Sequence, residues 1–134
     1  MSIEALQNAM LEQEQVDCKV EHRFSDGVYA RTLIIEPNIV LVGSKHKTNH
    51  LFVVLQGSGV FTDENGDAIT YQAPMIMETK AGTKRAIHAY TKTIMTSFHA
   101  TDEKDVEKIG EEILESEQAN ILPQWKKKLL EVLH

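Results

Sequence analysis

The stretch that decides the fold is Gly43-Ser44-Lys45-His46-Lys47-Thr48-Asn49-His50, which runs into an apolar segment that ends at Gly57-Ser58-Gly59. Side chains two residues apart on a β-strand point to the same face. If this stretch is a strand, His46, Thr48 and His50 face one interior together. Two imidazoles on one face can bind a metal ion or an anion, or can exchange protons. We therefore look for function in this part of the chain.

Short apolar segments with strand-like composition continue on both sides of this stretch. They are separated by turn sequences such as Asn65-Gly66 and Ala81-Gly82-Thr83. About eight short strands at this spacing predict a sandwich or a small barrel. The expected strands are residues 28–35, 39–42, 50–55, 59–62, 68–72, 75–79, 85–89 and 93–99.

The two ends of the chain have a helical rather than a strand-like pattern. Residues 2–15 predict a helix capped by Ser2, and residues 102–133 predict a helical tail in which Pro123 opens a second helix. The 134 residues then form one domain, with the helix, a β-barrel over 18–99 and the tail. Two amphipathic tails on a small barrel favour a homodimer or a higher homo-oligomer.

Composition excludes several classes of function. The net charge of -6 argues against nucleic-acid binding, and no apolar run approaches the roughly 18 residues that span a membrane. The single cysteine, Cys18, cannot form an internal disulfide, which indicates a reducing, cytoplasmic setting. Residues 43–92 carry six basic and four acidic side chains in this acidic protein, so we expect a small anionic ligand.

Residues 40–99 resemble the cupin family. The first cupin motif has a glycine, a His-x-His pair, a glutamate and a later glycine. Here Gly43 and Gly57 stand at the two glycine positions, and His46 stands at the second histidine. The first histidine position holds Ser44, and the glutamate position holds His50. Residues 80–85 are similar to the second motif, with Arg85 where that motif has a histidine. The resemblance implies a mainly β, single jelly-roll β-barrel that is often dimeric.

A narrower similarity joins Gly43, His46, residues 80–85 and residues 99–103 to small uncharacterised cupin-like proteins of tailed-phage genomes. This resemblance implies a viral or prophage origin. The protein would then act in the host cytoplasm or in the virion. One possible function is that of a structural or assembly protein of a virus, with the helical tail mediating assembly.

The histidines suggest a metal-dependent enzyme as one function. His46 and His50, with His99 from a neighbouring strand, are candidate ligands for zinc, nickel, iron or copper. The alternative is that they line a polar cavity. Arg85 stays protonated and is electrostatically unfavourable beside a cation, which puts the usual cupin metal chemistry in doubt.

The basic residues suggest a ligand-binding protein instead. Lys84 and Arg85 are candidates for the negative group of an anionic ligand, and His46, Thr48 and His50 would recognise the rest of it. An internal salt bridge between Arg85 and Glu78 is the simpler alternative. No catalytic residue follows from the sequence.

Overall fold

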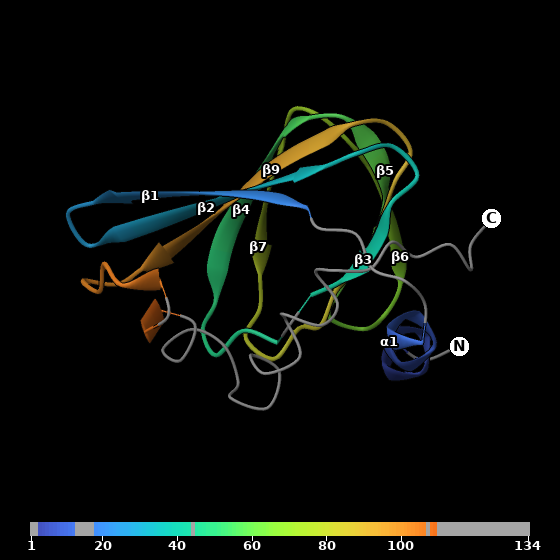
Figure 1. The fold of residues 1–134 in the computed structure, drawn as a ribbon, viewed down its shortest axis with the longest axis horizontal. Coiled ribbons are helices and arrows are strands. Elements are labelled where there is room, and N and C mark those ends of the chain that lie inside the picture. The colour runs from blue at the N-terminus through green and yellow to red at the C-terminus, as the bar shows by residue number, and fades with distance from the viewer. Residues whose placement is uncertain (1–2, 13–17, 44, 107, 110–134) are drawn as a thin grey trace.

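The computed structural model describes residues 3–12, 18–43, 45–106 and 108–109. The fold is mainly β, as the sequence predicts, with one helix followed by nine strands in this part of the chain (Figure 1). The elements are α1 (Ile3–Leu11), β1 (Lys19–Ser25), β2 (Val28–Ile35), β3 (Val40–Val42), β4 (His50–Gln56), β5 (Ser58–Thr62), β6 (Ala68–Gln72), β7 (Met75–Thr79), β8 (Ala86–Ala89) and β9 (Thr93–Ala100).

The strands form two antiparallel sheets that face each other. One sheet has the order β1-β2-β9-β4-β7 and the other the order β3-β8-β5-β6. The β1–β2 hairpin extends beyond the second sheet, at the left in Figure 1. Strands β2, β6 and β7 have the predicted bounds, and β1 is an additional strand that was expected only as part of the general barrel region.

Strand register determines which residues face the interior. Residues directly opposite each other on antiparallel strands share a face. The inward pairs between β2 and β9 are Tyr29 with His99, Arg31 with Ser97, Leu33 with Met95 and Ile35 with Thr93. Strand β4 continues this face, since Phe52 lies opposite Ser97 and Val54 opposite Met95. The inner face therefore changes from apolar to polar along three adjacent strands.

The apolar part of the interior is closed by packed aromatic rings. Phe61 packs edge-on against Phe52 and stacks on Tyr71 at a centroid distance of 5.5 Å. The Tyr71 hydroxyl and the Thr93 hydroxyl are 2.7 Å apart, so this buried phenol has a hydrogen-bond partner. Gly57 has a φ of 100° and lies against the Lys92 carbonyl, where a side chain would not fit.

Helix α1 covers the outer face of the second sheet. All three residues of β3 are buried, because Leu41 points into the central core while Val40 and Val42 pack with Met10 of the helix. This two-sided burial explains the continuous apolar run in β3. The helix was predicted over residues 2–15, and its described extent is Ile3–Leu11.

The chain turns toward a helix after β9. The Thr101 hydroxyl accepts a hydrogen bond from the Glu103 backbone N–H at 3.1 Å, as a helix-capping residue does. The Ile109 N–H donates to the Asp105 carbonyl at 2.9 Å. Most of the predicted tail, residues 110–134, lies outside the described residues. No helix in the described ranges is long and apolar enough to cross a membrane.

Candidate metal centre

Three histidines meet at the polar end of the interior. His46 precedes β4, His50 is the first residue of β4, and His99 lies near the end of β9. Their ring centroids are 4.3 Å (46 to 50), 4.4 Å (50 to 99) and 5.3 Å (46 to 99) apart. One potential ligand nitrogen from each ring lies within 4.8 Å of those from the other two. The structure thus brings together the three residues that the sequence nominated for a metal.

The path by which His46 reaches the cluster differs from the prediction. Residues 46–50 do not form one strand, because residues 47 and 48 form a bend and Thr48 is exposed. The argument that 46, 48 and 50 share a strand face is therefore wrong. A bend suits this position because it turns His46 back toward His50.

The turn at residues 80–83 holds the histidine loop in place. Gly82 donates its backbone N–H to the His46 carbonyl at 2.9 Å, and Ala81 donates to the Asn49 side-chain oxygen at 2.7 Å. Gly82 has a φ of 83°, a conformation that a residue with a Cβ rarely adopts. The two segments that resemble cupin motifs are thus joined directly by hydrogen bonds.

Hydrogen bonding leaves the imidazole nitrogens available. The His50 Nδ1 lies 3.4 Å from the Thr48 carbonyl, which can only accept, so this contact favours a proton on Nδ1 and a free lone pair on Nε2. His99 is 2% exposed, and neither of its ring nitrogens has a hydrogen-bond partner in the part of the chain that the structure describes. Buried polar atoms without partners cost free energy. A bound ligand would remove this cost.

Burial keeps the three imidazoles neutral. The pKa of His46 is lowered to about 2 and that of His99 to about 3, mainly by burial and also by the nearby His50. Burial likewise lowers the pKa of His50. A metal competes with protons for the same lone pairs, so neutral imidazoles are ready to bind one near pH 7.

Arg85 points into the interior but is already held by the protein. Its guanidinium donates to the Thr62 carbonyl and to the Thr79 hydroxyl, each at 3.0 Å. It also lies over the Phe52 and Phe61 rings, 4.9 Å and 4.6 Å from their centroids.

The other predicted anion-site residues have different surroundings. Glu78 pairs with Lys80, so the predicted alternative of a Glu78–Arg85 salt bridge is wrong. Lys84 is buried, with 7% exposure. The charge of Arg85 lowers the pKa of His46 and of His50.

Arg31 is the interior residue that the sequence reasoning missed. It lies on the inner face of β2, opposite Ser97 and one inward position from Tyr29, the partner of His99. A signal was present, because Arg31 is the one charged side chain in the apolar segment 28–35 and has the phase of its inward residues. Only the register with β9 shows that this phase leads to the histidines.

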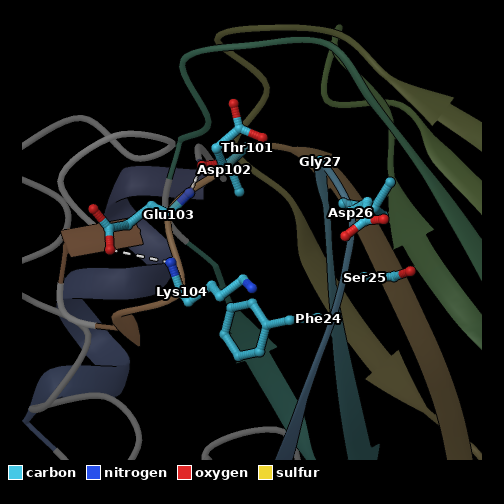
Figure 2. Close-up of a pocket in the computed structure, with 9 residues that line it drawn as sticks. Phe24, Ser25, Asp26, Gly27, Thr101, Asp102, Glu103 and Lys104 are labelled. Carbon is cyan, nitrogen blue, oxygen red and sulfur yellow. Dashed lines mark hydrogen bonds between the residues drawn. The ribbon is translucent and has the colours of Figure 1, made fainter.

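A separate hollow lies where the β1–β2 turn meets the segment after β9. Residues 24–28 and 101–104 line it, and its volume is about 260 Å³. Figure 2 shows the side chains around this hollow. Phe24 lines the hollow and stacks on Tyr29 at 5.2 Å, and Tyr29 in turn stacks on His99 at 6.0 Å. Aromatic rings therefore stand between this hollow and the histidines, and none of the predicted site residues line it.

Comparison with known proteins identifies the fold. No protein-family model matches the chain, and no curated protein sequence matches it. Solved structures do match. A cupin superfamily protein from Desulfitobacterium hafniense is 17% identical, with a TM-score of 0.55 over 66% of this chain and 81% of that one. A cupin domain from Bordetella pertussis is 10% identical, with a TM-score of 0.51 over 66% of this chain and 97% of that one.

An enzyme shares the fold as well. A salicylate 1,2-dioxygenase from Pseudaminobacter salicylatoxidans is 11% identical, with a TM-score of 0.58 over 84% of this chain but only 36% of the dioxygenase. These similarities show that the chain has the cupin fold, which confirms the jelly-roll prediction.

Proposed function

We propose that this protein is a metal-dependent cupin in which His46, His50 and His99 hold one divalent transition-metal ion. The observation that carries the proposal is the convergence of three neutral imidazoles, of which His50 and His99 are buried and His46 is partly buried. Neither nitrogen of His99 has a hydrogen-bond partner among the described residues. Zinc, nickel, iron and copper all accept imidazole ligands. The residues present therefore fit a metal by their chemistry and by their unsatisfied atoms.

The geometry requires only small ring movements. Metal–nitrogen bonds of about 2.0–2.1 Å place ligand nitrogens roughly 3.3 Å apart in a tetrahedral site. The nitrogens now lie within 4.8 Å of one another, so rotations about the side-chain bonds bring them into range. Three protein ligands leave at least one position open, the pattern of catalytic rather than structural metal sites.

The residues around Arg85 reduce the electrostatic repulsion that its positive charge would exert on a bound metal ion. The guanidinium is held by hydrogen bonds and ring faces, and the charges of Glu64 and Asp63 partly offset its own. A metal bound to the histidines would supply Lewis acidity at an open position. The fold shared with a dioxygenase supports a metal-dependent reaction on a small molecule, while the low identity assigns no substrate.

The first test is elemental analysis of untagged protein purified without chelators. We expect about one equivalent of metal per chain. His50→Gln and His99→Gln should each lose most of it, because two imidazoles bind a divalent ion much more weakly than three. His88→Gln is the matched control, since His88 is a half-buried histidine of β8 that lies outside the cluster.

Two results would count against the metal. One is a folded wild-type protein that stays metal-free after exposure to iron(II), zinc, nickel and copper. The other is a metal content that His50→Gln and His99→Gln leave unchanged, because the ion would then be held elsewhere.

We also propose a homo-oligomer, for which the outer face of the first sheet is the supporting feature. Leu51 and Leu55 of β4, Ile76 of β7 and Phe98 of β9 expose 52%, 59%, 70% and 39% of their area. Apolar clusters of this kind commonly mark interaction surfaces. Light scattering on eluted protein tests the oligomeric state, and a monomer at high concentration would contradict the proposed homo-oligomer.

The similarity to phage proteins stays a prediction.

A further inference from the structure

A second arginine in the interior, Arg31, has no hydrogen-bond or ion-pair partner among the residues that the structure describes. Arg31 is partly buried on β2, between the exposed and the fully buried residues of that strand. Arg23, on the neighbouring strand, shows the ordinary arrangement: it lies at the surface and pairs with Glu21 at 3.2 Å. A guanidinium turned inward without a partner requires an explanation.

The two inward arginines differ in how their charges are compensated. Arg85 has a carbonyl, a hydroxyl and two aromatic rings around it, and Glu64 and Asp63 support its charge. Among the described residues, the charge effects on Arg31 come from Tyr29 and Cys18, groups that are neutral near pH 7. Burial lowers the pKa of Arg31, but a guanidinium remains protonated in proteins. A buried cation without a counterion is destabilising.

Arg31 lies beside the histidine cluster. Its cross-strand neighbour is Ser97, and the adjacent inward pair along the same two strands is Tyr29 with His99. Its charge also lowers the pKa of both His46 and His99, which agrees with this placement. The positive charges of Arg31 and Arg85 therefore act on the neutral histidines, and a divalent metal would add more positive charge.

We propose that Arg31 binds the carboxylate of a small organic anion that occupies the interior next to the histidines. Guanidinium and carboxylate match as a planar, two-hydrogen-bond pair, and the Ser97 hydroxyl opposite Arg31 is placed to add a third bond. The proposed metal would be the second contact of the anion. This contact, unlike the one with Arg31, rests on the proposed function. Arg31 replaces Lys84 and Arg85 as the residue expected to hold the negative group.

Calorimetric titration with oxalate tests the proposal. Oxalate is a small dicarboxylate that can contact Arg31 with one end and a metal with the other, and oxamide is its neutral counterpart. We expect oxalate to bind metal-loaded protein and oxamide not to bind. Arg31→Gln should weaken oxalate binding roughly tenfold to a hundredfold, the usual loss for a charged hydrogen-bond partner. The oxalate affinity of Arg31→Lys should lie between those of the wild type and Arg31→Gln, since lysine keeps the charge but not the planar pair of N–H donors.

Arg23→Gln is the matched control, because it removes one surface arginine and should leave oxalate affinity unchanged. Thermal unfolding confirms that each variant is folded, and Arg31→Met serves in place of Arg31→Gln if the glutamine variant does not fold. The proposal is overturned if metal-loaded wild type does not bind oxalate, or if Arg31→Gln and Arg31→Met bind it as wild type does.

Metal analysis of the same samples separates the two proposals. Oxalate binding that depends on Arg31 in a protein that takes up no metal supports the anion site and rejects the metal centre. One equivalent of metal, together with oxalate binding that is unchanged in the Arg31 variants, supports the metal centre and rejects the anion site.

Discussion

The two ends of the interior are built on the same three strands and have opposite character. At one end, Ile35 of β2, Val54 of β4 and Thr93 of β9 have no measurable exposure. At the other end, the same strands present Arg31, His50 and His99. The first end consists of packed apolar groups and satisfied hydrogen bonds, while the second holds polar atoms without partners. The difference shows where the fold gains its stability and where polar groups cost some of it.

The largest expected effect comes from breaking the packed end. Phe61→Ala should lower the free energy of unfolding by about 3–5 kcal/mol, because Phe61 is 1% exposed and contacts Phe52 and Tyr71. Denaturant titration measures this loss. Phe24→Ala is the control, since Phe24 is 37% exposed and should cost much less. Equal losses in the two variants would show that the packed end has no special share in stability.

Acid should act on the polar end. In metal-free protein, His46 and His99 have folded-state pKa values of about 2 and 3, far below their ordinary value of 6.5. Below pH 6.5 the unfolded chain therefore binds more protons than the folded one, and the free energy of unfolding falls as the pH falls toward 3. At pH 5.5 these two groups together cost roughly 3 kcal/mol, and above pH 7 they cost almost nothing.

Urea titrations at several pH values between 7.5 and 4.5 measure this dependence. His99→Leu should reduce it, because one of the neutral buried imidazoles is gone. An unfolding free energy that stays constant over this range in metal-free protein would contradict the electrostatic description of the site.

The two inward arginines should respond oppositely to the same substitution. Arg31→Met should raise the free energy of unfolding by about 1 kcal/mol, because it removes a partly buried cation that has no partner among the described residues. Arg85→Met should lower it by about 2 kcal/mol, because hydrogen bonds to Thr62 and Thr79 are lost. Both are measured in anion-free, metal-free buffer. A loss of stability in Arg31→Met would give that residue a structural role instead.

The smallest effect is expected at the surface. Arg23→Gln breaks an exposed ion pair with Glu21, and we expect the free energy of unfolding to stay almost unchanged, because solvent screens such a pair. Thermal or urea unfolding at low and moderate salt checks this. A change as large as that of Arg85→Met would mean that the β1–β2 hairpin contributes more to stability than its exposure indicates.

Sequence patterns predicted most of the strands because alternation of apolar and polar residues and glycine turns are local properties. Strands β2, β6 and β7 have the predicted bounds, and His46, His50 and His99 were nominated together as metal ligands from their residue type and the expected adjacency of strands. The strand through residues 46–50 was a wrong prediction, because a bend at 47 and 48 depends on hydrogen bonds from the distant 80–83 turn.

The sequence by itself determined that this chain folds as a small β-rich domain, since the spacing of its strands and turns is encoded locally. Tertiary structure decided which polar residues meet. The register of β2 with β9 places Arg31 beside the partner of His99, and the facing sheets bring Phe52 and Phe61 around Arg85. Two arginines of the same chemistry thereby acquire different surroundings, because compensation of a charge depends on neighbours that are distant in sequence.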